Sequence, residues 1–302
     1  MRYTLLYPMN VGGDHRLRRP EGIARIAETA ERLGFSAIAF TDHPAPSAKW
    51  MESGGHESLD PLTALAFVAG VTRKIRLLTY LLVLPYRNPL LVLKQAATAD
   101  IVSSGRLTLG VGAGYLKSEF AALGVDFAER NDLLDEAVEL LRYDHQQGAL
   151  TFEGRHFTAD AQSQRPGPIQ LPHPPLWFGG NSRLSHRRVA KYGQGWMPLI
   201  RDDLTTRTTR TRPLSSPNEL ATATRDLRQL LSDNNRDPGS IDVQADWQRA
   251  SALEMGIDSV RDSVAELSDA GANWVLFEPR GDRLEDTVDA IYQYGEQVIG
   301  HV

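Results

Sequence analysis

The sequence predicts a single (β/α)8 TIM barrel with insertion segments, and three observations lead to this fold class. Apolar segments of strand length alternate with segments of helical periodicity along nearly the whole chain. The alternation repeats about eight times, which is the number of units in such a barrel. The apolar segments are too continuous to have a face in water, which indicates parallel strands covered by helices.

The strand segments are short apolar runs bounded by polar or glycine-containing turns. In chain order they are residues 3–7, 36–42, 75–85, 106–114, 176–180, 195–200, 241–245 and 273–279. The helix segments carry apolar residues at helical spacing, and Asp60 and Pro61 have the residue types of a helix start. In chain order they are residues 20–33, 60–72, 88–104, 129–148, 182–193, 217–234, 257–270 and 284–299. A doubly wound open sheet would show the same alternation and is the alternative fold.

Residues 1–302 are expected to form one barrel domain with an irregular insertion over about 149–175. Within the insertion, "RPGPIQLPHPP" (165–175) carries five prolines, which exclude a helix. Two further segments, 43–59 and 201–216, are polar and follow predicted strand ends. They are predicted to be mobile loops that cover the mouth of the barrel and select the substrate.

The composition is that of a globular protein with a net charge of −5 and no cysteine. The lack of cysteine excludes disulfides and thiolate ligands, and the histidines show no metal-binding spacing, so no metal site is expected. The net negative charge gives no support to a nucleic-acid partner. The segment "MRYTLLYPMN" is too short and too broken for a signal peptide. No apolar run reaches the roughly 20 residues that span a bilayer, so a cytoplasmic protein without membrane contact is expected.

The segment "RLTLGVGAGYLKSEF" (106–120) places glycine at three alternating positions of the fourth predicted strand. It does not fit the dinucleotide-binding motif G-x-G-x-x-G, because Tyr115 stands where the third glycine would be. Glycine weakens a strand, so the alternation needs a reason. Either a flat ligand lies against the backbone of Gly110, Gly112 and Gly114, or these residues allow tight packing or a bulge.

Two other strand ends carry residue types that suit chemistry. The segment "WFGGNS" (177–182) ends a strand with two glycines and begins a helix, so its free backbone N–H groups could bind an anion such as phosphate. The segment "TDHP" (41–44) places Asp42 beside His43, where the histidine could transfer a proton and the aspartate could orient it. The alternatives are an ordinary capped turn in the first case and a loop cap beside a surface histidine in the second.

These motifs occur in one recognisable order. The segments "GFSAIAFTDHP", "TYLLVLPYRNPLLVLKQAATADIVSSGRLTLGVGAGYLKSEF", "PGPIQLPHPPLWFGGNS" and "RRVAKYGQGWMP" follow one another along the chain. In order, spacing and residue identity the chain resembles the bacterial luciferase-like superfamily, over roughly residues 3–200. Within that superfamily it most resembles the oxidoreductases that depend on the deazaflavin coenzyme F420.

The resemblance implies that a flat ring lies in the mouth of the barrel, where the glycines make room for it. The third strand would bulge behind the ring, with a non-prolyl cis peptide bond at Tyr80–Leu81. Asp42, His43 and Tyr115 would be the catalytic residues at the reactive edge of the ring, and the phosphate would lie on the "GGNS" segment. The cofactor-binding residues implied are Tyr80, Leu81, Gly112, Ala113, Gly114, Gly179, Gly180, Asn181, Ser182 and Met197.

The implied function is hydride transfer between coenzyme F420 and a small organic substrate. The alternative cofactor is FMN, in an FMN-dependent monooxygenase of the same fold. A second alternative is a non-catalytic flavin- or deazaflavin-binding protein. A third is a cofactor-free barrel hydrolase with carboxylates such as Asp42, Glu119 and Glu278 as its acid/base pair. Members of the superfamily are commonly dimers, so a homodimer is expected.

Overall fold

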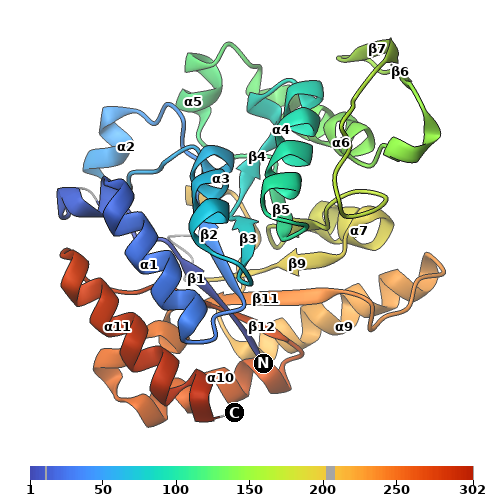
Figure 1. Ribbon diagram of the computed structural model, residues 1–302. Helices are drawn as coiled ribbons and strands as arrows, with labels where there is room; N and C mark the ends of the chain where they lie inside the picture. Colours follow the sequence, from blue (N-terminus) through green and yellow to red (C-terminus); the bar gives the residue numbers. More distant parts are fainter. Residues whose placement is uncertain (11, 202–207, 302) are drawn as a thin grey trace.

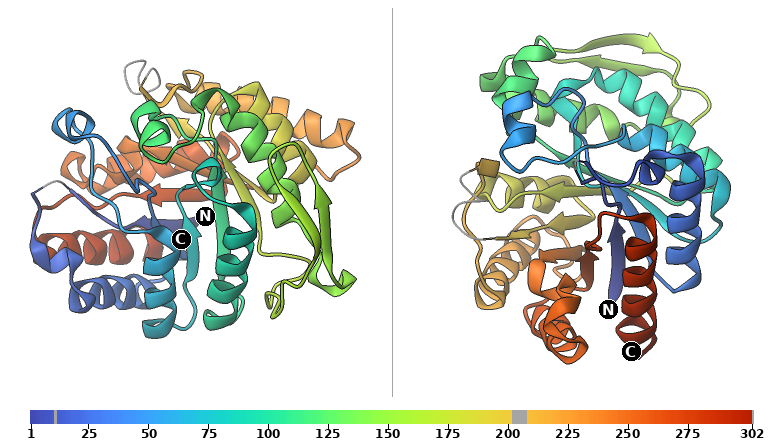
Figure 2. Two further views of the ribbon diagram at one scale, coloured as in Figure 1. Left: turned by 90° about the horizontal axis from the view of Figure 1, so that it is seen from above. Right: turned by 90° about the vertical axis from the view of Figure 1, so that its left-hand side faces the viewer.

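The computed structural model describes residues 1–10, 12–201 and 208–301, and its centre is a barrel of parallel strands surrounded by helices (Figures 1 and 2). The described barrel strands are β1 (Arg2–Leu6), β2 (Ala37–Phe40), β3 (Arg76–Thr79) with β4 (Leu82–Val83), β5 (Leu107–Gly112), β8 (Leu176–Gly179), β9 (Gly195–Met197) with β10 (Leu199–Ile200), β11 (Asp242–Trp247) and β12 (Trp274–Phe277). Strand β11 pairs with β12 on one side and with β9 on the other, which closes the barrel. The predicted fold class is therefore confirmed, and the open sheet is wrong.

Eight long helices cover the barrel in the described part of the chain. They are α1 (Pro20–Arg32), α3 (Pro61–Val71), α4 (Pro89–Val102), α6 (Arg130–Leu141), α7 (Arg183–Tyr192), α9 (Pro217–Asp233), α10 (Ile257–Asp269) and α11 (Leu284–Gln297). Side-chain caps fix several starts: Asp60, Asn88 and Ser216 each accept a hydrogen bond from a backbone N–H of the first turn, just before a proline. Each strand is thus followed by a helix that returns the chain to the opposite end of the barrel.

The predicted helix over 129–148 is shorter in the structure, because α6 ends at Leu141 and residues 145–147 form a separate 3-10 turn. The insertion that was expected to be irregular contains an antiparallel hairpin, β6 (Leu150–Glu153) and β7 (Thr158–Gln162). The prolines of the insertion begin only after this hairpin, so its backbone is free to pair. The hairpin lies at the periphery of the molecule, away from β1 and α11 (Figures 1 and 2).

The two predicted loops differ in how much structure they contain. The segment 43–59 includes a short helix, α2 (Ala48–Glu52), whose start is capped by Ser47. In the segment 201–216, residues 202–207 lie outside the described residues, and Arg201 forms an antiparallel bridge with Leu214. A second short helix, α5 (Lys117–Ala122), follows β5. The mobility of both loops stays a prediction.

Two hydrophobic clusters hold the barrel together. The larger one lies between the strands and the helices. The smaller one consists of alternate strand residues that fill the barrel interior: Leu6, Ala37, Ala39, Leu78, Trp177, Met197, Trp274 and Leu276. Tyr80 and Leu81 pack against this inner cluster, so the interior of the barrel supports the residues that follow β3.

The third strand contains a bulge that the glycines of β5 accommodate. The register with β5 changes by one residue between the Leu77–Leu107 pair and the Leu82–Val111 pair, and the Tyr80–Leu81 peptide bond is cis, as the family resemblance implies. A Cβ on Gly112 would lie 2.7 Å from Leu81 Cδ1. The glycines therefore make room for the bulged strand, which is the packing alternative that the sequence left open beside a flat ligand.

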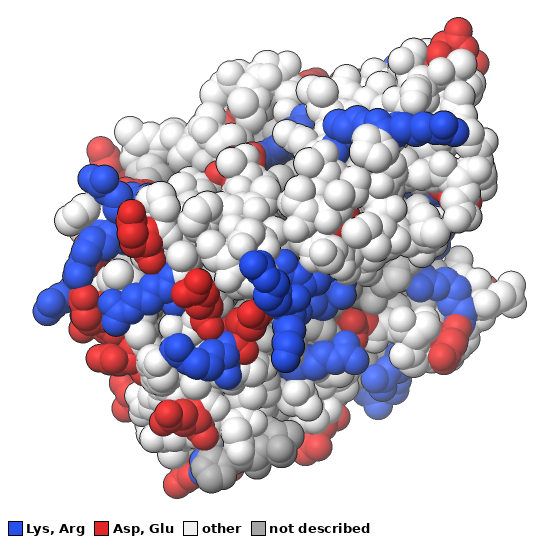
Figure 3. Space-filling view, viewed as in Figure 1, with Lys and Arg blue, Asp and Glu red and all other residues white. Residues whose placement is uncertain are grey.

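The surface seen in Figure 3 has basic and acidic side chains interspersed, without a large area of one sign on that face. Among the described helices, none combines the length and the apolar character that crossing a bilayer requires.

The substitution Gly110→Ala tests the packing of β5 on the third strand. The added Cβ would lie 2.1 Å from the backbone oxygen of Thr79, so we expect the free energy of unfolding to fall by about 3 kcal/mol. Urea unfolding followed by circular dichroism measures this change. Gly70→Ala is the control, because a Cβ in that helical position meets no atom within 4 Å and should add about 0.5–1 kcal/mol. Equal stability of the two variants would contradict the close contact.

Candidate cofactor and active site

A cavity of about 530 Å³ opens at the carboxyl ends of the barrel strands, where active sites of such barrels lie. Every residue that the sequence predicted for the site lines this cavity, except Asn181. The lining residues from the prediction are Asp42, His43, Tyr80, Leu81, Gly112, Ala113, Gly114, Tyr115, Gly179, Gly180, Ser182 and Met197. The barrel therefore brings together the ends of its second, third, fourth, fifth and sixth strand units.

His43 is held by Glu119, a buried carboxylate from α5. The Nδ1 atom of His43 lies 3.0 Å from Glu119 Oε2. The backbone N–H of Ala45 and the hydroxyl of Tyr86 also donate to this carboxylate, at 3.1 Å each. Because a carboxylate accepts hydrogen bonds, Nδ1 of a neutral His43 carries the proton and Nε2 is left as an acceptor.

Asp42 has a structural role that the sequence did not predict. Its carboxylate accepts from the backbone N–H of Val83 at 2.8 Å and from both terminal nitrogens of Arg87 at 2.6 and 2.8 Å. Its side chain makes no hydrogen bond to the imidazole of its neighbour His43, although both residues belong to the described chain and line the cavity. The expectation that Asp42 orients His43 is wrong, because Glu119 does so.

Aromatic rings surround the imidazole of His43. Its ring centroid lies 4.5 Å from that of Trp50, 5.0 Å from that of His56 and 5.9 Å from that of Tyr115. Burial and, to a smaller extent, the charge of Glu119 raise the pKa of Tyr115 to about 12, so its hydroxyl keeps its proton at neutral pH. Burial lowers the pKa of His56, with a further contribution from His43.

Trp50 and His56 were absent from the predicted site, although both lie in the segment 43–59. His56 lines the cavity, and its Nδ1 lies 2.9 Å from the backbone oxygen of Glu57, to which it donates. The sequence of a polar loop has no hydrophobic periodicity, so it does not predict the direction in which these side chains point. Only the presence of aromatic and histidine side chains close after His43 could have drawn attention to them.

Part of the cavity wall is cationic. Arg130 and Arg188 from α6 and α7 line it, together with Arg210. The guanidinium carbons of Arg130 and Arg210 lie 4.0 and 5.4 Å from the ring centroid of Phe127, so these two groups are near one another. Burial, and then the charges of Arg210 and Arg188, lower the pKa of Arg130. Arg188 is paired with Asp135 at 2.6 Å, whereas Arg130 donates to the backbone oxygen of Phe127. Guanidinium groups and the start of a helix together suit a phosphate.

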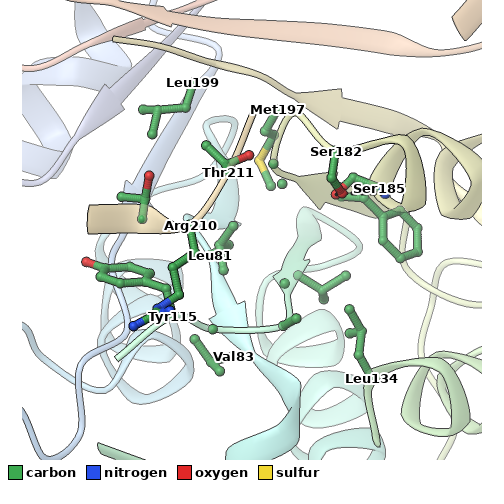
Figure 4. A pocket seen from close by; sticks show the side chains of 18 of the residues that line it. Leu81, Val83, Tyr115, Leu134, Ser182, Ser185, Met197, Leu199, Arg210 and Thr211 are labelled. Carbon is green, nitrogen blue, oxygen red and sulfur yellow. Dashed lines mark hydrogen bonds between the residues drawn. The ribbon is translucent and has the colours of Figure 1, made fainter. Parts of the chain in front are cut away.

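Two serines at the start of α7 complete this cationic part. Ser182 caps the helix by accepting from the backbone N–H of Ser185 at 3.1 Å, and the two hydroxyl oxygens lie 3.0 Å apart. Figure 4 shows Ser182 and Ser185 on one side of the cavity and Tyr115, with Arg210 beside it, on another. Gly180 adopts a φ of +95°, a conformation that favours glycine, just before the helix begins.

Asn181 joins two backbone segments and lies outside the cavity. Its side-chain nitrogen donates to the backbone oxygens of Leu199 and Arg212 at 2.8 and 3.0 Å, and its oxygen accepts from Leu199 N at 3.0 Å. Its backbone N–H donates to the Thr211 hydroxyl at 2.7 Å. The expectation that Asn181 binds the phosphate is therefore wrong, because its polar groups already have partners within the protein.

The bulge of the third strand is anchored on the far side of the barrel mouth. The hydroxyl of Tyr80 donates to Asp246 at 2.8 Å, and Arg201 pairs with the same carboxylate at 2.5 Å. Burial raises the pKa of Tyr80 well above its usual value, with a contribution from Asp246. Burial, together with the nearby charge of Asp246, also raises the pKa of Glu278.

Comparison with known proteins identifies the family. The profile described as luciferase-like monooxygenase matches residues 1–252, which is most of the chain. The chain belongs to the luciferase-like monooxygenase family. The superfamily named from the sequence is thus confirmed.

Relatives in the luciferase-like family differ in cofactor. The F420-dependent hydroxymycolic acid dehydrogenase of Mycobacterium tuberculosis is 31% identical over 191 residues, 62% of this chain and 51% of the relative. The FMNH2-dependent dimethylsulfone monooxygenase of Pseudomonas putida is 31% identical over 179 residues, 57% of this chain and 46% of the relative. The chain thus spans about half the length of these curated relatives. A crystal structure of a monooxygenase from Streptomyces bottropensis has the same fold, with a TM-score of 0.83 at 20% identity, covering 100% of this chain and 99% of that one.

The cavity of this luciferase-like barrel fits a flat ring that bears a phosphate. Its floor is apolar, with Leu81 and Val83 from the third strand and Phe178 and Met197 from the fifth and sixth strand units. The missing Cβ atoms of Gly112 and Gly179 leave room for Leu81 to form this floor. The cationic part would hold the phosphate, and the His43 part would face the reacting atoms.

The substitution Asp42→Asn tests the structural role of Asp42. Loss of the carboxylate charge leaves the largely buried guanidinium group of Arg87 without its ion-pair partner at position 42. We therefore expect the free energy of unfolding to fall by about 3 kcal/mol. Asp258→Asn removes a carboxylate from an exposed pair with Arg261 and should change stability by less than about 1 kcal/mol. Urea unfolding of both variants measures the difference, and equal small losses would contradict a structural role for Asp42.

Proposed function

We propose that this protein is an oxidoreductase that transfers a hydride between coenzyme F420 and a small organic substrate. The observation that carries the proposal is the imidazole of His43, held by the buried Glu119 beside Tyr115 at the edge of a cavity whose other part is cationic. The first part suits proton transfer, and the second suits a phosphate.

The bound deazaflavin would supply the hydride chemistry, and the protein would supply position and proton handling. Arg130, Arg210 and the start of α7 would hold the phosphate, because they line one part of the cavity. The apolar floor at Leu81 would exclude water from the face of the ring that it covers. These contacts would fix the ring at the distance that hydride transfer needs.

His43 would handle the proton that accompanies the hydride. When a hydride leaves the carbon of an alcohol, the hydroxyl proton must leave too, and Nε2 of His43 can accept it. Glu119 would stabilise the resulting imidazolium through Nδ1, at 3.0 Å. Tyr115 keeps its proton and can donate a hydrogen bond to the substrate oxygen. The reverse direction would use the same groups to protonate the reduced substrate.

The preference for F420 over FMN in this proposal rests on His43 as the proton-handling group and on the mycobacterial F420-dependent relative. The relative from Pseudomonas putida favours a second candidate, an FMN-dependent monooxygenase. Both cofactors carry a ring and a phosphate, so the cavity suits either one. Binding measurements can separate the two candidates.

A fluorescence titration of the purified protein with F420 and, separately, with FMN tests the proposal. We expect micromolar or tighter binding of F420 and weaker binding of FMN. Stronger binding of FMN would favour the monooxygenase, which oxygen consumption with a reduced flavin would then examine. Binding of neither compound would overturn both candidates, and tight binding without turnover of any alcohol, imine or enone would favour a binding protein.

The substitution His43→Ala tests the role of the imidazole. Loss of acid–base catalysis should lower the single-turnover rate by about 10²–10⁴-fold while the F420 dissociation constant changes little. His15→Ala is the control, since the His15 side chain is 74% exposed and outside the cavity. An unchanged rate in the His43 variant would remove His43 from proton transfer.

The homodimer and the cytoplasmic location expected from the sequence stay predictions. Light scattering coupled to size-exclusion chromatography measures the oligomeric state of the purified protein.

A further inference from the structure

A second cavity, of about 670 Å³, lies outside the barrel between α7 and α9. The two helices are neighbours, as Figure 1 shows. The second cavity is close to the cofactor cavity along the chain. Gly180 and Ser182 line the cofactor cavity. The residues that directly follow them, Asn181 and Arg183, line the second cavity.

His186 provides a buried polar atom without a partner in this second cavity. The residue is only 8% exposed, and its Nε2 atom has no hydrogen-bond partner among the described residues. Its ring packs edge-on against Trp196, with 4.7 Å between the centroids. The indole N–H of Trp196 already donates to the backbone oxygen of Gly180, so it cannot satisfy the histidine. A buried polar group of this kind normally has a partner, and here a ligand could supply it.

Three exposed arginines lie around this histidine. Arg183 lies one turn before both His186 and Arg187 on α7, Arg212 comes from the segment before α9, and all four residues line the cavity. None of the three guanidinium groups has an ion-pair partner within 4.0 Å among residues 1–10, 12–201 and 208–301. Such groups bind carboxylates and phosphates in a planar geometry.

Two carboxylates also line the second cavity and reduce its positive charge. Glu219 is occupied, because it accepts from the backbone N–H and the hydroxyl of Ser215 at 2.7 and 3.2 Å. Asp226 lies on α9 and contributes a negative charge near His186. The three guanidinium groups still outnumber the two carboxylates, so the net charge favours an anion.

We propose that the second cavity binds an anionic oxygen group, a phosphate or a carboxylate, through Arg183, Arg187 and Arg212, with Nε2–H of His186 as a further hydrogen-bond donor. Two sources could supply this group. One is a free phosphate. The other is the chain of glutamate residues that coenzyme F420 carries beyond its phosphate, and this source rests on the proposed function. The short separation along the chain between the two cavities is what makes the second source available.

In the first experiment the histidine rings of the protein are labelled with 13C. Inorganic phosphate is then added in steps, and the ring signals are followed by NMR. The signal of His186 is assigned by its loss in His186→Gln. We expect that signal to move in a saturable way. In the double variant Arg183→Gln/Arg187→Gln the apparent dissociation constant at this signal should rise about tenfold or more. Arg225→Gln/Arg228→Gln is the control, because it removes the same charge from exposed positions of α9 that do not line the cavity.

The second experiment compares F420 with and without its glutamate residues. If the glutamate chain occupies the second cavity, the Arg183/Arg187 variant should lose about tenfold in affinity for the full cofactor and little for the shortened one. If free phosphate is the ligand, the variant should lose phosphate binding at His186 and keep its affinity for both cofactors. A His186 signal that does not respond to phosphate, together with equal cofactor affinities in all variants, would overturn the proposal. Failure of F420 to bind the wild-type protein would overturn the proposed function. The phosphate titration alone would then decide whether the second cavity binds an anion.

Discussion

The one-residue bulge in the third strand is the feature on which the candidate site depends. It directs the side chain of Leu81 into space that Gly112 and Gly179 leave open, since a Cβ on either glycine would lie within 2.7 Å of that side chain. Tyr80 is fixed by Asp246 on the opposite side of the barrel mouth, and the backbone N–H of Val83 is fixed by Asp42. The floor of this cavity is therefore fixed from three directions.

Two buried carboxylates at this site have partners of different kinds, and the partners separate their roles. Asp42 is paired with the guanidinium of Arg87, which keeps its proton at any physiological pH, so the pair can only hold the structure together. Glu119 is paired with the imidazole of His43, whose Nδ1 lies 3.0 Å from the carboxylate. A buried carboxylate thus holds backbone and guanidinium groups together at one position and orients an imidazole at the other, because the two partners differ.

Several features of the site were predictable because they depend on local sequence. The alternation of strands and helices gave the barrel, and a barrel places the strand ends at one mouth, so His43, Tyr115 and the glycine turn before α7 were expected together. Glu119 was visible as a carboxylate after the fourth strand, but its contact with His43 joins residues 76 positions apart. No periodicity reports such a contact. Trp50 and His56 were missed for a related reason, because an irregular loop gives no rule for the direction of its side chains.

The sequence by itself determined the fold class and the strand ends that line the mouth, because hydrophobic periodicity, helix caps and glycine positions act within a few residues of one another. The family followed from the order and identity of its motifs. The tertiary structure decided which charged groups pair and that Asp42 and Asn181 are structural. It also decided that Nε2 of a histidine on α7 is buried without a hydrogen-bond partner in the described part of the chain. These features arise only when the barrel closes and brings distant segments together. Burial then makes each unpaired charge or polar atom costly, and the partner that each one finds decides its role.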